Sequence, residues 1–457
     1  MERRELITLL VASVATAILL LDVTIVYVAL PSIRSDLGAG FDQVQWVIDA
    51  YTVVMAATLL ACGSLADRLG RRLIFIVGLF VFTGCSAICG LAGNIAVVDF
   101  ARGFQGFGAA ALYASSLALL ANEFQGARRG LAFGVWGAVT GAALAVGPLI
   151  GGLVIDGLSW RWIFLVNLPI GIITLLVTIL GVRESRARVP GRFDLPGTLL
   201  FGISAFLFVL GLIRGNEDGW GSTPVLGAFI LGLVAAAVFV RVEMVAENPM
   251  LPLRHFRSPP FSGTAIASFA QSVAIYPLLL FLAIYLQEGL GFGPTEAGLR
   301  LLPMTLMILL VAPFAGRLTS KATIRLPLIS GLMLLALSLL VIHGVQPGDS
   351  WTGLLPGMIL GGASIGLISP SLAAAMVSVL PVEQSGLASG INNTARQLGI
   401  AIGIAGLGAI FDHQVLRAAN PLAGIASGLN AVIVVSALTA VLAAAICWPL
   451  LGQQRSG

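Results

Sequence analysis

Long apolar runs separated by short polar loops dominate this chain. We count fourteen runs that are long enough to cross the hydrocarbon core of a bilayer, which takes about 20 mainly apolar residues in an α-helix. The runs lie near residues 6–30, 44–66, 73–93, 97–122, 131–157, 161–182, 194–213, 223–245, 260–287, 295–318, 326–343, 352–378, 385–411 and 427–451. The pattern predicts an all-α membrane protein with fourteen transmembrane helices. The first run is too long for the apolar part of a signal peptide, so we expect it to be an uncleaved helix.

Arginine accumulates in every second loop. The arginine-rich segments are residues 68–72, 128–129, 183–192, 241–257 and 317–325. Short loops rich in lysine and arginine stay in the cytoplasm. The alternation therefore predicts a multi-pass protein of the plasma membrane with both termini in the cytoplasm.

Composition excludes several classes of protein. Of 457 residues, 58% are hydrophobic and 10% are charged, whereas soluble domains are about 25% charged. The net charge of +4 reflects the arginines of the cytoplasmic loops and not a basic nucleic-acid-binding surface. We therefore expect no nucleic-acid partner. The cysteines and histidines match no metal or redox motif. Because we find no catalytic nucleophile–base pair and no nucleotide-binding loop, we expect neither an enzyme nor a cofactor.

An internal repeat divides the chain. A shift of 253 residues places Gly63 on Gly316, Arg72 on Arg325 and Gly78 on Gly331. Two six-helix bundles in parallel repeat form one known transporter architecture, and the large shift leaves room for two extra helices between them. We predict an N-terminal six-helix bundle in residues 1–190, two inserted helices in residues 191–255 and a C-terminal six-helix bundle in residues 256–457.

Charged side chains within the apolar runs are the strongest functional signal. Asp22, Asp49 and Arg102 lie at similar depth in the first, second and fourth runs. Each such charge costs at least ~2.5 kcal/mol at the centre of a helix. A nearby arginine favours the ionised form of a carboxyl group, whereas burial favours the neutral form. We therefore predict that these residues form a proton-coupling cluster. A fixed structural ion pair is the alternative, and Asp49 could instead bind cationic cargo or have neither role.

Polar side chains on otherwise apolar helices predict a substrate cavity. The helix that begins its polar face at Arg102 continues it with Gln105 and Tyr113, and packing with incidental polar groups is the alternative. The full set of candidate cavity residues is Gln105, Tyr113, Gln271, Tyr276, Asn392, Asn393 and Arg396.

The segment GSLADRLGRR predicts a tight cytoplasmic turn between the second and third helices. Gly63 and Gly70 are expected to break the helices, and Asp67 can bind a helix N-terminus or an arginine. The arginines of this segment, Arg68, Arg71 and Arg72, hold the turn in the cytoplasm. An ordinary positively charged loop is the alternative reading.

Glycines cluster around a proline in the fifth run. Gly147, Pro148, Gly151 and Gly152 occur in TGAALAVGPLIGG. Proline removes a backbone hydrogen bond, and glycine lets a neighbouring helix approach closely. The segment is expected to act as a hinge or a seal, although packing alone would explain the glycines.

Together these motifs resemble the fourteen-helix drug:proton antiporter branch of the major facilitator superfamily. The resemblance rests on LDVTIVYVALPSI (Leu21 to Ile33), GSLADRLGRR, RGFQGFGAA (Arg102 to Ala110), GPLIGG (Gly147 to Gly152), SWRWIFLVNLPIG (Ser159 to Gly171) and NNTARQLGIAIG (Asn392 to Gly403). Tyr27 departs from the motif, which more often has asparagine there. The resemblance implies the major facilitator fold, gating by the turn from Gly63 to Arg72 and exchange of cargo for protons, with coupling roles for Asp22 and Arg102.

The expected function is therefore proton-driven export of lipophilic drugs, antibiotics or related small molecules by alternating access. A dedicated exporter of one metabolite and a lipid or glycolipid translocator are the alternatives. The expected partners are a small lipophilic substrate, protons and membrane lipids, and the chain is expected to be a monomer.

Overall fold

The computed structural model describes residues 3–124, 126–186, 194–247, 249–319, 325–379 and 385–451. In this part of the chain, all regular secondary structure is helical. The helices are α1 (Arg3–Leu37), α2 (Phe41–Leu69), α3 (Arg71–Leu91), α4 (Ile95–Glu123), α5 (Gly126–Gly157), α6 (Trp162–Leu165), α7 (Asn167–Gly181), α8 (Leu195–Asp218), α9 (Thr223–Val245), η1 (Leu253–Arg257), α10 (Pro259–Ile284), η2 (Tyr285–Gly289), α11 (Pro294–Thr319), α12 (Arg325–Ile342), η3 (Trp351–Leu354), α13 (Leu355–Val379), α14 (Ser385–Arg417) and α15 (Pro421–Leu451). The prediction of an all-α membrane protein is confirmed.

The apolar helices match the predicted runs closely. Thirteen helices within the described ranges are long and apolar enough to cross a membrane. The remaining predicted run, 131–157, corresponds to α5. Within α5, the segment Val146–Gly157 is apolar but shorter than a membrane span. The run near 161–182 is divided into α6 and α7, which together form one candidate span, Trp162–Gly181.

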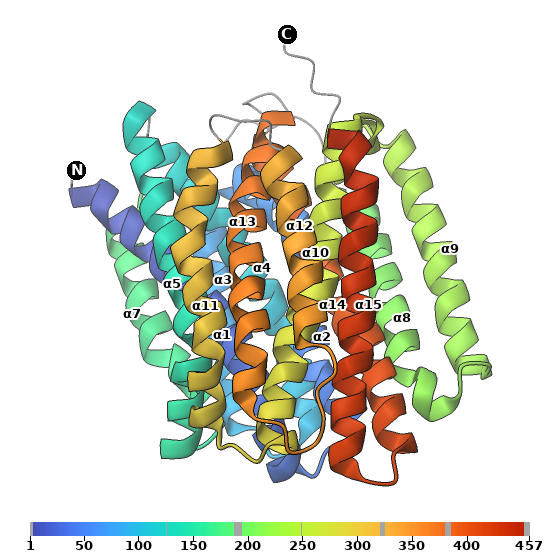
Figure 1. Cartoon of the computed structure of the whole chain (residues 1–457). Helices are drawn as coiled ribbons and strands as arrows, with labels where there is room; N and C mark the ends of the chain where they lie inside the picture. The colour runs from blue at the N-terminus through green and yellow to red at the C-terminus, as the bar shows by residue number, and fades with distance from the viewer. Residues whose placement is uncertain are drawn as a thin grey trace.

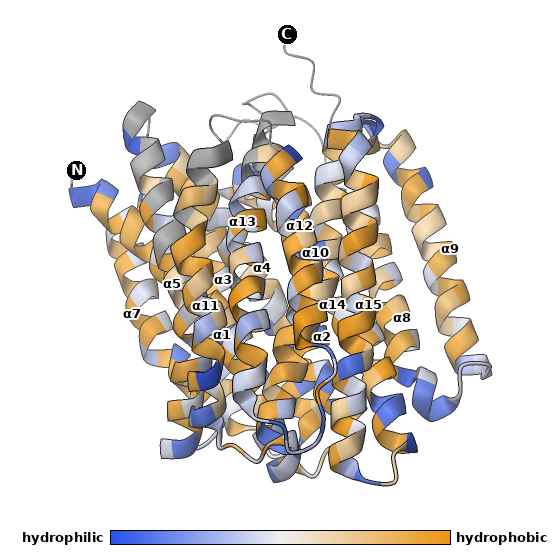
Figure 2. Ribbon diagram, in the orientation of Figure 1, coloured by the Kyte–Doolittle hydropathy of each residue, from blue (hydrophilic) through white to orange (hydrophobic). Residues whose placement is uncertain are grey.

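The helices run up and down between two polar ends, and the first residue of α1 and the last residue of α15 lie at the same end (Figure 1). We call this the proximal end, and we call the opposite end, where α1 meets α2, the distal end. Apolar residues predominate in the middle of the helices, while polar residues gather toward the ends (Figure 2). Many large apolar side chains of the outer helices are exposed, among them Phe80, Leu180 and Leu231. A surface of this kind faces lipid, which removes the usual penalty for exposing apolar side chains to water.

The two helices predicted as inserted are α8 and α9, which pack against each other at one side of the bundle (Figure 1). Helix α8 contacts α2 of the N-terminal bundle and α14 of the C-terminal bundle. The predicted boundary at residue 190 lies outside the described residues. So do residues 320–324, which belong to the segment that repeats the turn from Gly63 to Arg72 in the second half of the chain.

Besides a small shared cluster of Leu60 with Phe261, Ala265 and Ile391, the two bundles share one large apolar core, which lies toward the distal end. There, a continuous cluster includes Ile33 and Val47 from one bundle and Phe281 and Leu429 from the other. Phe411 stacks on Phe281 at 4.5 Å and on Phe41, from the N-terminal bundle, at 5.7 Å between ring centroids. Toward the proximal end, the two largest clusters each belong to a single bundle.

Polar contacts hold the same seam closed. Arg34 and Glu288 form an ion pair at 3.4 Å between their nearest nitrogen and oxygen atoms. Gln287 donates through Nε2 to the carbonyl oxygen of Val28 at 3.0 Å. Asp156 accepts the backbone N–H of Thr295 at 2.8 Å, near the start of α11. The structure therefore has its distal end closed.

Glycines in α5 permit this closure. A Cβ at Gly151 would lie 3.1 Å from Cγ2 of Ile25 in α1, and a Cβ at Gly152 would lie 2.5 Å from Cα of Thr295 in α11. On the same seam, Gly298 of α11 faces the carbonyl oxygen of Pro148. Helix α5 of the N-terminal bundle therefore packs against α1 of the same bundle and α11 of the other bundle. The backbones approach so closely that glycine is required at these positions.

We expect Gly152→Val to destabilise the closed protein. The added atoms meet the backbone of α11, and overpacking of this kind typically costs about 1–3 kcal/mol. Thermal unfolding in detergent should show a lower melting temperature. Gly227→Val is the matched control, because no atom lies within 4 Å of a Cβ at Gly227 in α9. Equal melting temperatures for the two variants would contradict the close packing.

Candidate functional site

A buried ion pair joins α1 and α4. The guanidinium of Arg102 donates through NH1 to Oδ2 of Asp22 at 2.5 Å, and both side chains are 1% exposed. Arg102 also donates through Nε to the carbonyl oxygen of Val47 at 2.8 Å and through NH1 to Oε1 of Gln105 at 2.9 Å. The ring of Tyr51 lies 4.2 Å from its Cζ atom. The arginine is thus held by contacts on several sides.

Amide groups surround the second oxygen of the carboxylate. Oδ1 of Asp22 accepts from Nε2 of Gln105 at 3.4 Å and from Nδ2 of Asn167 at 3.5 Å. Both amides also donate to Oγ of Ser86, at 3.2 Å and 3.0 Å. Ser86 in turn donates to the carbonyl oxygen of Phe164 at 3.0 Å. We call Asp22, Ser86, Arg102, Gln105 and Asn167 the coupling network.

Glycines in α4 bring the network together. A Cβ at Gly106 would meet the backbone of Tyr51 in α2, and a Cβ at Gly108 would lie 2.7 Å from the backbone nitrogen of Phe82 in α3. The resulting contact between helices allows Arg102 to reach a carbonyl oxygen of α2. The sequence RGFQGFGAA therefore combines the charged group with the small residues that let its partners approach.

Protonation of Asp22 would change the bonding of the coupling network, which is named here after the role predicted for Asp22 and Arg102. An ionised Asp22 accepts hydrogen bonds from Arg102, Gln105 and Asn167, so its charge is compensated without water. A proton on this carboxyl group removes the attraction to the guanidinium and turns an acceptor into a donor. Because the surroundings are apolar, that change acts on a strong interaction.

Asp49 lies outside this network. Its side chain is fully buried in α2, and neither carboxylate oxygen has a hydrogen-bond partner among the described residues. The hydroxyl of Tyr27 is likewise buried without a described partner, and the two side chains are electrostatic neighbours. The structure therefore brings together two of the three predicted coupling residues and leaves the third near a tyrosine.

Two members of the network, Ser86 and Asn167, were not predicted from the sequence. Both are polar residues inside apolar runs, and that feature was their only signal. Asn167 occurs in SWRWIFLVNLPIG, while Ser86 stands between two buried cysteines. Their contact with Asp22 and Gln105 depends on how α3 and α7 pack, which spacing along the chain does not show.

The turn between α2 and α3 is tighter than predicted. Helix α2 continues to Leu69, so only Gly70, with φ of 131°, separates it from α3. The expectation that Gly63 breaks the helix is wrong. A Cβ at Gly63 would contact only Cβ of Ala114, at 3.9 Å, and tertiary packing of α2 outweighs the weak helix propensity of glycine.

Charged side chains hold this turn. Asp67 accepts from NH2 of Arg71 at 2.8 Å, so it binds an arginine. The N-terminus of α3 is capped by Glu184, which accepts the backbone N–H groups of Arg72 and Leu73 at 3.0 Å and 3.1 Å. Arg68 donates to Oγ of Ser64 at 3.2 Å. The turn is thereby tied to the segment after α7.

The predicted cavity residues fall into two groups. Gln105 is fully buried in the coupling network, whereas Tyr113 lies where the bundles meet, with Cζ of Arg396 at 5.9 Å from its ring centroid. In the C-terminal bundle, Nε2 of Gln271 lies 3.4 Å from Oγ of Ser369. Tyr276 is partly exposed, as is Asn392, while Asn393 is buried. Direct contact of these side chains with cargo stays a prediction.

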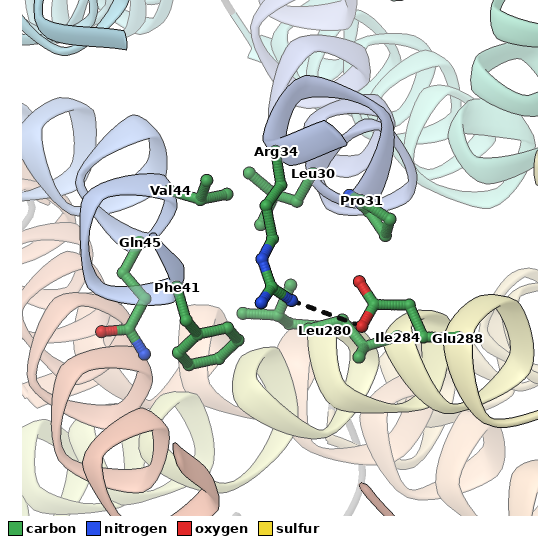
Figure 3. A pocket seen from close by; sticks show the side chains of 9 residues that line it. All are labelled: Leu30, Pro31, Arg34, Phe41, Val44, Gln45, Leu280, Ile284 and Glu288. Carbon is green, nitrogen blue, oxygen red and sulfur yellow. Dashed lines mark hydrogen bonds and ion pairs between the residues drawn. The ribbon is translucent and has the colours of Figure 1, made fainter. Parts of the chain in front are cut away.

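A small pocket opens at the distal seam, away from the predicted cavity residues (Figure 3). The ion pair of Arg34 and Glu288 forms part of its wall, together with Phe41 and Gln45. Among the described residues, no group of three or more histidine, cysteine, aspartate or glutamate side chains could hold a metal ion.

Comparisons with known proteins agree on the family and the fold. The Major Facilitator Superfamily profile matches residues 12–404. The chain is 36% identical over 411 residues to "Multidrug resistance protein Stp" of Mycobacterium tuberculosis, which covers 90% of this chain and 76% of that protein. It is 34% identical to "Tetracenomycin C resistance and export protein" of Streptomyces glaucescens (89% and 76% covered) and 34% identical to "Puromycin resistance protein pur8" of Streptomyces alboniger (98% and 91% covered).

Among solved structures, the peptide transporter POT in complex with sulfate matches with a TM-score of 0.72 at 15% identity, covering 98% of this chain and 96% of that one. The human organic anion transporter MFSD10 matches with a TM-score of 0.67 at 15% identity, covering 98% and 100%. At this identity, the likeness shows the fold.

We expect the effects of Asp22→Asn and Arg102→Gln on the free energy of unfolding to be strongly coupled. Each single change leaves a buried polar group without its counterion, and breaking such a pair typically costs about 3–5 kcal/mol. The double variant should therefore lose much less stability than the sum of the two. Unfolding in detergent measures this double-mutant cycle.

The control cycle uses Arg214 and Asp218, an exposed pair at 3.5 Å. Exposed pairs contribute about 0–1 kcal/mol, so its coupling energy should be small. Additive losses in the Asp22–Arg102 cycle would show that the pair does not act as a unit.

Proposed function

This chain belongs to the Major Facilitator Superfamily, and we propose that it exports lipophilic drugs, antibiotics or related small molecules across the plasma membrane in exchange for protons. The coarser statement, that it is a multi-pass membrane transporter, follows from its family and its apolar helices. Three relatives are named for resistance to drugs or antibiotics, which supports the choice of cargo.

The observation that carries the proposal is the coupling network. The side chain of Asp22 is 1% exposed, and its charge is compensated by Arg102 and two amides. When a proton neutralises Asp22, Arg102 keeps Val47 and Gln105 as partners but loses its counterion. The contacts between α1, α4 and α7 then change in strength. This is how proton uptake would alter the packing of the N-terminal bundle.

Helix α1 connects the network to the closed end. Asp22 precedes Thr24 and Ile25 in α1, which contact Gly147 and Gly151 of α5. Farther along the same helix, Val28 and Arg34 bind Gln287 and Glu288 of the other bundle. A shift of α1 that follows protonation would therefore act directly on the distal seam, which must open for cargo to leave.

The charge distribution supports an orientation with the proximal end in the cytoplasm. The turn from Arg68 to Arg72 and both described chain ends lie at that end, and cytoplasmic loops are enriched in lysine and arginine. In this orientation the distal end faces outward. The structure then represents a state in which the end that faces the exterior is closed.

A narrower function is the second candidate. Two relatives are named for a single compound, tetracenomycin C or puromycin. An exporter dedicated to one antibiotic would use the same fold and the same coupling network, so only the range of transported compounds separates the two functions.

The test is dye uptake into inverted membrane vesicles with an imposed proton gradient, acidic inside. We expect uptake of lipophilic dyes to depend on the gradient and to fall at least about tenfold in Asp22→Asn and Arg102→Ala, because a lost counterion removes the proton response. Initial rates are measured with anionic, neutral and cationic dyes and are normalised to the amount of protein in the membrane.

Asp218→Asn is the control, since Asp218 lies at the end of α8, far along the chain from the network. It should retain gradient-driven uptake. If an ionophore that collapses the gradient leaves uptake by the native protein unchanged, proton exchange is excluded.

A further inference from the structure

One intramembrane cation lacks an acidic partner in the part of the chain that the structure describes. Arg396 lies in the candidate span Gly390–Arg417, and no described ion pair includes it. Its Nε atom is buried without a described hydrogen-bond partner. A cation inside the bilayer costs at least ~2.5 kcal/mol, so such a group normally faces a partner or a pathway. Arg102, by contrast, has its carboxylate partner within the chain.

Helix packing places Arg396 where the two bundles meet. Gly399 and Gly403 follow it on the same helix face, and they lie against the backbone of α10 at Phe269 and Val273. That face of α14 is therefore pressed onto α10, which carries Tyr276, an electrostatic neighbour of the guanidinium. The ring of Tyr113, from α4 in the other bundle, lies 5.9 Å from Cζ of Arg396.

Further hydrogen-bonding groups surround this position. Asn392 stands four residues earlier on the same face and is partly exposed, and its Oδ1 is buried without a described partner. Arg396 and Tyr276 are themselves only partly exposed. The group combines a guanidinium that interacts with Tyr113 and whose Nε–H has no described acceptor, an amide and two phenol rings. This combination suits a polar group attached to an aromatic or apolar body.

The unpartnered acid on the other bundle does not neutralise Arg396. Asp49 is fully buried, and its described electrostatic link is to Tyr27, which in turn neighbours Tyr276. The electrostatic neighbours of Arg396 are Tyr113 and Tyr276, and no described interaction joins Arg396 to Asp49. The positive charge therefore remains available.

We propose that Arg396, with Tyr113, Tyr276 and Asn392, binds an acidic group of the exported compound, such as a carboxylate, phenolate or enolate. The proposal rests on the export function proposed above, and it names the cargo class as amphipathic organic anions. A planar guanidinium presents paired donors that match a carboxylate or two adjacent oxygen atoms. Apolar surroundings strengthen the attraction, and the phenol rings supply contact area for the body of the cargo.

The experiment measures dye binding to the purified full-length protein in detergent, without a proton gradient. Fluorescein and rhodamine 6G share a xanthene ring but carry opposite charge at neutral pH. We expect the native protein to bind fluorescein more tightly. Arg396→Gln should raise the Kd for fluorescein by about tenfold or more, which corresponds to about 1.4 kcal/mol, and should leave the Kd for rhodamine 6G within about twofold. Arg396→Lys, which keeps the charge but loses the planar fork, should be intermediate.

Arg214→Gln is the control, because that arginine is 53% exposed at the end of α8. Equal effects of Arg396→Gln on both dyes, or on neither, would show that Arg396 has only a structural role and would overturn the proposal. If Arg396→Gln does not fold, the native protein alone still tests the proposal. Tighter binding of rhodamine 6G than of fluorescein, or no binding of either dye, would overturn it. If the protein binds fluorescein selectively through Arg396 but transports dyes without a proton gradient, the anion-binding site is supported and proton exchange is excluded.

Discussion

The buried contact between Asp22 and Arg102 is the interaction on which this structure depends. Within apolar surroundings each charge alone would be costly, and together they are stable only because further groups complete their hydrogen bonds. Val47 and Gln105 complete the bonds of the arginine, while Gln105 and Asn167 complete those of the carboxylate. The requirement to satisfy this pair fixes how α1, α2, α4 and α7 approach one another.

Close helix packing is the second requirement, and glycine meets it both within the N-terminal bundle and between the two bundles. Gly106 and Gly108 bring α4 against α2 and α3, and Gly152 and Gly298 bring α5 against α11. In a bilayer the helices gain little from the hydrophobic effect when they associate, so contact depends on close van der Waals packing. One set of glycines builds the network and another seals the distal end, and helix α1, which carries Asp22 and contacts α5, links the two regions.

The charged groups Asp22, Arg102, Asp49 and Arg396 therefore have different surroundings. Arg102 is neutralised by Asp22, Asp49 is buried without a described partner, and Arg396 faces tyrosines at the seam between the bundles. A transporter needs one group whose charge changes during the cycle and another that recognises cargo. The two proposed sites meet these needs at separate positions, one inside the N-terminal bundle and the other between the bundles.

The sequence by itself determined the class of protein, the number and course of the apolar runs and the identity of the charged residues. These properties depend on local composition, because a helix in lipid must satisfy its own backbone and show an apolar surface. Only the tertiary structure decided which polar groups meet. It paired Asp22 with Arg102 but left Asp49 outside, added Ser86 and Asn167, and kept Gly63 within a continuous helix. Side-chain contacts between helices depend on rotation and tilt, which packing across the whole bundle sets and which a periodic apolar pattern does not encode.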